Sequence, residues 1–271
     1  MVQKLYPGGK SKVFNVSYDD GVEQDVRFTA LLNRYGLKGT FNINFWMTHT
    51  QFQWVHESGL VVKRLPESAL KDVYAGHEVA SHSFSHPYMD NFSEGEILKE
   101  MGADRFFLQR LFDREIAGYA TPFYFFSDQM AQCARECGFA YARISEESND
   151  YSRTEDFYHW RGSKFHWDED LEEFVEGFLQ TDRELAMCQL VGHSYDLDVY
   201  DMWQRMEKIL SRVSQCDEVW PATHSELVQY LRAMDQAFIT NDTVSNHSPE
   251  PLWFRIHGEI TMLKPGEVRH I

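Results

Sequence analysis

The chain has 271 residues, of which 43% are apolar or aromatic, and its formal net charge is −16. This length suits one large domain, or one domain with a small appendage. So negative a chain is a poor ligand for a nucleic-acid backbone or an anionic membrane, and we expect neither as a partner. The first residues lack the apolar core of a signal peptide, and no apolar run reaches the length of a membrane span. These features predict a cytoplasmic protein.

The four cysteines are too few and too irregularly spaced for a disulfide framework or a CxxC zinc site. We therefore expect free thiols at Cys133, Cys137, Cys188 and Cys216.

Short apolar segments alternate with amphipathic ones along most of the chain. Strands are predicted at 12–18, 39–45, 77–86, 116–123, 139–145 and 185–194, with a short one near 218–221. Helices are predicted at 25–36, 66–76, 93–112, 127–138, 168–180, 200–214 and 223–234, and Ser93 is a plausible cap of the third. About seven strand–helix units of this kind indicate an α/β fold, either a parallel barrel or a wound sheet.

The pattern changes after about residue 237. Residues 250–270 alternate in polarity and have turn signals at His257-Gly258 and Pro265-Gly266, which predicts two short antiparallel strands. We expect a barrel over residues 1–237 and a small β appendage over 238–271. The appendage strands could pair with another copy of the chain, so a homo-oligomer is an open expectation.

Polar side chains stand where several predicted strands end, which is where a barrel carries its functional groups. Asp19 and Asp20 end the first strand, His82 and His86 follow the third, and His193 ends the sixth. Two imidazoles four residues apart suit a zinc-like metal, although for the pair taken alone two loop histidines bonded to backbone or water are the favoured explanation.

One strand-terminal aspartate would complete a metal-binding set of two histidines and a carboxylate, leaving a position open for water. The second aspartate could then act as a base. The alternative for the Asp-Asp-Gly segment is a solvated acidic turn.

The segments SYDDG, HSFSH, YATPF and LVGHS, in this order, resemble the carbohydrate esterase family 4 polysaccharide deacetylases, also called the NodB homology family. The stretch GLKGTFNIN is similar to that family's second strand, and the resemblance covers roughly residues 10–235 of a divergent, leaderless branch. It implies a distorted (β/α) barrel that binds a divalent metal, most often zinc, with cobalt, nickel or manganese as alternatives. It also implies an acetylated saccharide as the substrate.

The resemblance further implies a role for each matching residue. Metal ligation would fall to Asp20, His82 and His86, with Asp19 as the general base and His193 as the general acid. The backbone N–H of Phe123 would take the oxyanion-hole position, and Ser83 would orient part of the metal-site loop.

Two departures from the family pattern stand out. The third motif usually begins with an arginine that orients the catalytic aspartate, whereas this chain has Ala120, and the aspartate–tryptophan pair of the fourth motif has no match. Arg143, near the end of the fifth predicted strand, could replace the missing arginine by pairing with Asp19 or another carboxylate of the site. The alternative is a surface arginine.

Further residues near the strand ends allow two readings each. Asp196 and Asp198 either tune the pKa of His193 or are solvated loop acids. His166 either lines the cleft or is an exposed histidine at a helix entry, and we expect the exposed position. The aromatic residues Trp160, Trp203 and Tyr195 either stack on sugar rings or pack in the core.

The sequence thus predicts a metal-dependent hydrolase that removes N- or O-linked acetyl groups from a carbohydrate. One alternative is the same scaffold acting on another amide or ester. The other is a catalytically inactive carbohydrate-binding protein that has kept the barrel and lost the metal.

Overall fold

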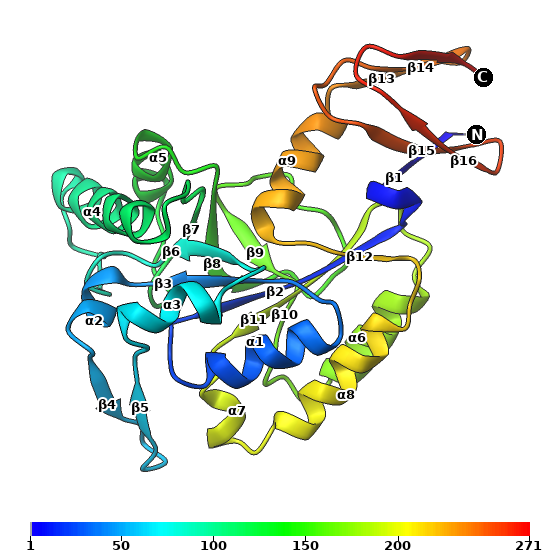
Figure 1. Cartoon of the computed structure of the whole chain (residues 1–271). Helices are drawn as coiled ribbons and strands as arrows, with labels where there is room; N and C mark the ends of the chain where they lie inside the picture. The colour runs from blue at the N-terminus through cyan, green and yellow to red at the C-terminus, as the bar shows by residue number, and fades with distance from the viewer. Residues whose placement is uncertain (1) are drawn as a thin grey trace.

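The computed structural model describes residues 2–271, and its centre is a nine-stranded parallel sheet that curls toward a barrel (Figure 1). Neighbouring strands follow the order β10-β11-β2-β3-β6-β7-β8-β9, and β12 pairs with β2. The two ends of the sheet approach each other, because the N–H of Ser163, after β9, donates to the carbonyl of Gln189 in β11 at 2.9 Å. The strands are β2 (Lys12–Asp19), β3 (Gly39–Ile43), β6 (Glu78–Ser81), β7 (Gly118–Ala120), β8 (Tyr141–Glu147), β9 (Trp160–Gly162), β10 (Lys164–Phe165), β11 (Ala186–Gly192) and β12 (Val219–Pro221).

Helices cover the outside of this sheet, as Figure 1 shows. Helices α4 and α5 lie together at one side, and α6 and α8 lie together at another. The helices are α1 (Asp25–Arg34), α2 (Phe45–His49), α3 (Glu67–Val73), α4 (Glu94–Phe112), α5 (Asp128–Glu136), α6 (Leu171–Gln180), α7 (Asp196–Val199), α8 (Trp203–Ser214) and α9 (His224–Met234). The expected α/β barrel-like architecture is therefore confirmed.

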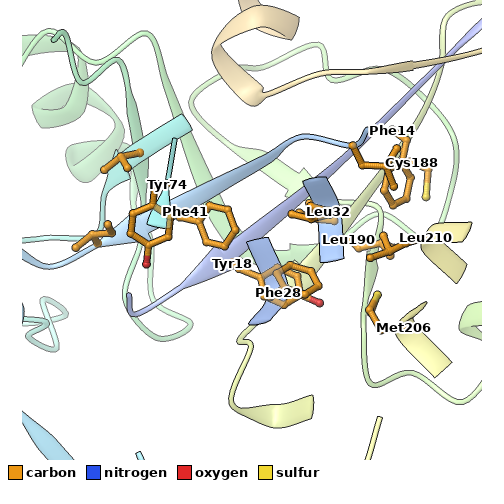
Figure 2. Close-up of a cluster of buried hydrophobic side chains, with 14 of the residues drawn as sticks. Phe14, Tyr18, Phe28, Leu32, Phe41, Tyr74, Cys188, Leu190, Met206 and Leu210 are labelled. Carbon is orange, nitrogen blue, oxygen red and sulfur yellow. The ribbon is translucent and has the colours of Figure 1, made fainter. Parts of the chain in front are cut away.

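Strand β2 shows how the sequence places the site. Alternate side chains of a strand point to opposite faces, and Phe14, Val16 and Tyr18 belong to the core that also holds residues of α1 and α8 (Figure 2). The rings of Tyr18 and Phe28 stack at 4.1 Å, a contact worth about 1 kcal/mol beyond burial. Asp19 directly follows Tyr18, so its side chain points to the opposite face, into the barrel, at the carboxyl end of the strand.

Most predicted elements are confirmed, including the capping box that Ser93 forms with Glu96 at the start of α4. The sequence missed β9 and β10, helices α2 and α7, and a hairpin of β4 (Gln53–Val55) and β5 (Val61–Lys63) that projects from the body. Each of these elements spans five residues or fewer, which is too short for a helical or alternating pattern to be distinguished.

The C-terminal region contains more strands than expected. The predicted hairpin is confirmed as β15 (Leu252–Ile256) and β16 (Glu259–Leu263), joined at His257-Gly258. The N-terminal strand β1 (Val2–Leu5) pairs with β15, so both chain ends lie in this region (Figure 1). A second small sheet contains β13 (Ala237–Ile239), β14 (Thr243–Asn246) and β17 (Val268–His270).

Two global features agree with the sequence. The four cysteines are free thiols in the part of the chain that the structure describes. Among residues 2–271, no helix is both long enough and apolar enough to cross a membrane.

Candidate active site

The carboxyl ends of the parallel strands bring the predicted residues into one pocket of about 200 Å³. Asp19 and Asp20 stand at the end of β2, His82 directly after β6, and His193 directly after β11. Single ligand atoms of Asp20, His82 and His86 lie within 4.8 Å of one another. Asp20 and His82 are 62 positions apart in sequence, and the parallel register of β2, β3 and β6 brings them together.

The donor set fits a divalent cation such as zinc. The Nδ1 atom of His82 contacts the carbonyl oxygen of Ala120 at 2.9 Å, which leaves Nε2 free to face the pocket. Burial lowers the pKa of His82 to about 4 and also lowers the pKa of His86, so both imidazoles are neutral, as metal ligands must be. The Oδ1 atom of Asp20 is buried and accepts no hydrogen bond from any residue that the structure describes.

Arg64 is a site residue that the sequence did not reveal. It follows the β4–β5 hairpin, its side chain is buried, and its guanidinium lies 2.9 Å from Oδ1 of Asp20 without a directed hydrogen bond. It also donates to the backbone carbonyl of Asp20. Burial alone would raise the pKa of Asp20, but the charge of Arg64 and the nearby histidines hold it well below its usual range. No motif marks Arg64, so only the folded chain identifies it.

The loop from His82 to His86 is anchored by carboxylates of α4. Asp104 accepts hydrogen bonds from the N–H of His82 at 3.1 Å and from the hydroxyl of Ser81 at 2.6 Å. Glu100 accepts from the N–H and the hydroxyl of Ser85, both at 2.9 Å. The hydroxyl of Ser83 is buried and lies 2.9 Å from that of Tyr119, which fits the orienting role proposed for Ser83.

Unusual backbone conformations gather at this site. Asp20, Ser83, His86 and Phe123 have φ values of 87°, 63°, 55° and 58°. A non-glycine residue with positive φ costs about 1–3 kcal/mol and persists only where the surrounding structure enforces it. Four such residues around one pocket are typical of a functional site rather than of a solvated turn.

Arg143 binds Asp19 inside the barrel. One guanidinium nitrogen of Arg143 donates to both carboxylate oxygens of Asp19, and the Asn42 amide donates to the same carboxylate at 2.7 Å. The Arg143 side chain is only 1% exposed, so the surface alternative is wrong. Burial alone would raise the pKa of Asp19, but the charges of Arg143, His82 and His193 together with the Arg143 hydrogen bond outweigh burial and hold this pKa below its usual range. Arg143 is the register partner of Ala120 on the neighbouring strand, which is where the resemblance placed an arginine.

A buried chain of hydrogen bonds supports His193. Its Nδ1 atom lies 3.0 Å from Oδ2 of Asp196, and the same oxygen lies 3.2 Å from Nε2 of His166. Nδ1 of His166 in turn contacts the hydroxyl of Tyr18 at 2.5 Å. Burial lowers the pKa of His193, but the bond to Asp196 and the charge of Asp20 raise it to about 9. His193 therefore holds a proton at neutral pH.

The hydrogen bonds behind His193 correct one prediction and decide between two alternatives in another. His166 is fully buried, so the prediction of an exposed histidine was wrong. It follows the two-residue strand β10, which the sequence did not reveal, and this strand turns the ring inward. Asp196 is the acid that contacts His193, whereas Asp198 accepts from the indole N–H of Trp203 at 2.7 Å.

The aromatic candidates divide between the core and the pocket. Trp160 and Trp203 are buried, as in the core alternative. Tyr195 lines the pocket and stacks on His193 with ring centroids 4.9 Å apart. Phe123 also lines it, and no backbone acceptor for the Phe123 N–H is present within residues 2–271.

Comparisons with solved structures support the same fold. A protein from Mycobacterium smegmatis, provisionally described as a polysaccharide deacetylase, is 15% identical with a TM-score of 0.61, covering 86% of this chain and 94% of its own. The family 4 carbohydrate esterase domain of a multidomain xylanase, from the hindgut metagenome of Trinervitermes trinervoides, is 18% identical with a TM-score of 0.54 (82% and 92% covered). A family 4 pseudoenzyme from Bacillus anthracis is 16% identical with a TM-score of 0.50 (83% and 68% covered).

No curated protein matches the chain in sequence. The family model described as polysaccharide deacetylase, however, matches residues 7–142, which is half of the chain. The match includes the strand ends that carry Asp19, Asp20, His82 and His86. This chain belongs to the polysaccharide deacetylase family.

Proposed function

We propose that the protein is a metal-dependent hydrolase that removes acetyl groups from a carbohydrate. The observation that carries this proposal is the arrangement of five polar side chains around one pocket: Asp19, Asp20, His82, His86 and His193. Asp19 is held ionised by Arg143, and His193 is held protonated by Asp196. A base and an acid therefore face the same pocket in opposite protonation states, as acyl transfer to water requires.

Asp20, His82 and His86 are the residues that would hold the metal, with zinc the best match to two neutral imidazoles and one carboxylate. When bound, a divalent cation supplies Lewis-acid polarisation of the acetyl carbonyl and makes water a better nucleophile.

Asp19 is proposed to accept the proton from the attacking water. Its carboxylate lines the pocket and lies 4.0 Å from Nε2 of His82, next to the proposed metal position. Arg143 and Asn42 hold both of its oxygens, so the carboxylate cannot rotate away from the pocket. The charge of Arg143, with smaller contributions from His82 and His193, also keeps the pKa of Asp19 below its usual range, so the carboxylate is anionic at neutral pH, which a base needs.

His193 is proposed to protonate the leaving amine or alcohol. Asp196 binds Nδ1, so Nε2 faces the pocket and lies 4.0 Å from Oδ2 of Asp20. The backbone N–H of Phe123 is proposed to stabilise the oxyanion, because Phe123 lines the same pocket in an enforced left-handed conformation.

Two alternatives remain. An inactive carbohydrate-binding protein would need neither an ionised buried Asp19 nor a chain of buried partners behind His193, and maintaining both is costly. Hydrolysis of another amide or ester would use the same groups, and substrate assays distinguish it directly.

The test is metal content by elemental analysis together with acetate release from a panel of N- and O-acetylated oligosaccharides. We expect about one zinc per chain and acetate release, and we expect His82→Ala to lose both. Arg143→Ala should lower turnover sharply and retain the metal, because Arg143 contacts Asp19 rather than the three proposed ligands. A chain that binds no offered metal and releases no acetate would refute the proposal.

A further inference from the structure

Two buried arginines lie beside the two adjacent aspartates of the site, and they contact them differently. One nitrogen of Arg143 donates hydrogen bonds to both carboxylate oxygens of Asp19. The guanidinium of Arg64, a side chain only 3% exposed, lies 2.9 Å from Oδ1 of Asp20 without a directed hydrogen bond, and its Nε has no acceptor among residues 2–271. The hydrogen bond from Arg64 to Asp20 goes to the backbone carbonyl instead. Arg64 therefore compensates the charge of the Asp20 carboxylate while Oδ1 receives no hydrogen bond from the described residues.

The contacted oxygen is the one that faces the proposed metal position. Nε2 of His86, a proposed ligand, lies 3.5 Å from Oδ1 of Asp20, whereas Nε2 of His193 lies 4.0 Å from Oδ2. Arg64 and a divalent cation would therefore share one carboxylate oxygen. Two positive charges at one oxygen repel each other strongly in a buried site, because little water screens them. Binding of the metal must then weaken the contact of Arg64 with Asp20.

Arg64 directly follows the β4–β5 hairpin, which projects from the body in Figure 1. The N–H of Leu65 donates to the carbonyl of Gly21 at 2.8 Å, which ties the end of the hairpin to the residue after Asp20. The guanidinium carbon of Arg64 also lies 5.2 Å from the centroid of the Trp54 ring. This distance is within the ~6 Å range of a cation–π contact, so the charge of Arg64 keeps a favourable partner when a metal takes Oδ1.

We propose that Arg64 is a built-in counter-ion of Asp20, which a divalent cation displaces from Oδ1, and that its charge lowers the affinity of the site for that cation. This rests on the proposed function, because it requires that Asp20, His82 and His86 bind a metal. It adds a regulatory property to that site. The pocket keeps its shape without metal, since the buried Asp20 charge is always compensated, and the metal is held less tightly than the three ligands alone would hold it.

A purely structural role for Arg64 predicts the opposite result. Asp20 has a φ of 87°, and the hydrogen bond from Arg64 to its carbonyl supports this conformation. If that support were the only role of Arg64, its removal would displace a ligand and weaken metal binding. If Arg64 competes with the metal, its removal makes the site more negative and strengthens metal binding. The direction of the change in metal affinity therefore distinguishes the two roles.

The test measures the dissociation constant of zinc at neutral pH by competition with a chelating dye, using the full chain without substrate. We expect Arg64→Met to bind zinc at least about tenfold more tightly than the wild type, and Arg64→Lys, which keeps the charge, to stay within about threefold. Lys63→Met is the matched control, because it removes a positive charge from the same hairpin at an exposed position. Water and salt screen that charge, so zinc affinity should change by less than about twofold.

Urea unfolding provides a second readout that does not depend on activity. In EDTA, Arg64→Met should be less stable than the wild type, because the charge of Asp20 is left buried without its partner. Excess zinc should reduce this difference, because zinc supplies the missing positive charge and binds the variant more tightly. A variant that folds only with zinc in the medium gives the same result in its strongest form.

Three outcomes would overturn the inference and leave the hydrolase standing. The first is an unchanged or weaker zinc affinity of Arg64→Met, and the second is an equal shift in Arg64→Met and Arg64→Lys. The third is an Arg64→Met chain that fails to fold even in saturating zinc. A wild-type chain that binds no zinc would instead overturn the proposed function itself.

Discussion

The buried pair of Asp19 and Arg143 makes a prediction that does not depend on substrate. Removing one member of a buried ion pair usually costs about 3–5 kcal/mol, because the other charge is left in a low-dielectric interior. Arg143 is 1% exposed, and after its removal only Asn42 would still donate a side-chain hydrogen bond to Asp19. We therefore expect Arg143→Met to lower the free energy of unfolding by about 3–5 kcal/mol, equivalent to roughly 10 °C in Tm.

A double-mutant cycle isolates the pair from the rest of the change. The variant Asp19→Asn combined with Arg143→Met removes both charges, so it should recover most of the stability that the single Arg143→Met loses. The assay is urea unfolding of all four proteins in EDTA, so that metal binding does not contribute. A coupling energy within about 0.5 kcal/mol of zero would show that the two charges do not depend on each other, and it would refute the reasoning.

Two further predictions follow from groups near the site. Burial raises the pKa of Asp25 to about 7, although Ser194 and Tyr74 donate hydrogen bonds to it. The folded state thus holds this proton more tightly than the unfolded state, so the contribution is full below pH ~4 and is lost as pH rises through 7. Relative to Asp25→Asn, the wild type should lose about 4 kcal/mol of unfolding free energy between pH 4 and pH 8, measured by urea titration. A constant difference between the two proteins would contradict this. In Gly192→Ala, the new Cβ would lie 2.5 Å from Nε2 of His166, which is held at both nitrogens. A displaced His166 would also displace Asp196, because the same Asp196 oxygen contacts both His166 and His193. We therefore expect this variant to retain zinc and to have a kcat for acetate release at least tenfold lower than the wild type. Wild-type kcat would show that the His166–Asp196 chain is dispensable.

The sequence predicted the residues of the site but only part of its support. Motifs placed Asp19, Asp20, His82, His86 and His193 at strand ends, and parallel strands must gather their carboxyl ends at one edge. Arg143 could be suggested from sequence because it lies near the end of a strongly patterned strand. Its alternative as a surface arginine was removed by the register that sets it opposite Ala120.

The local sequence pattern did not predict three residues that support the site, namely Arg64, His166 and Asp104. Each reaches the site from an element whose neighbours in sequence carry no motif, namely a hairpin, a two-residue strand and the middle of a long helix. Their roles depend on contacts across 22 or more residues of chain, such as the 3.2 Å contact of His166 with Asp196. Local propensity cannot encode such contacts, because they exist only when separate elements have packed.

The sequence by itself determined the alternation of strands and helices, the strand-terminal carboxylates and imidazoles, and the family to which they point. These features are local, because a strand and the residue that ends it are consecutive in the sequence. Only the tertiary structure decided which charged groups pair with each other and whether His166 is buried. Those properties arise from burial and from the register between strands, and both are set by the packing of the whole chain.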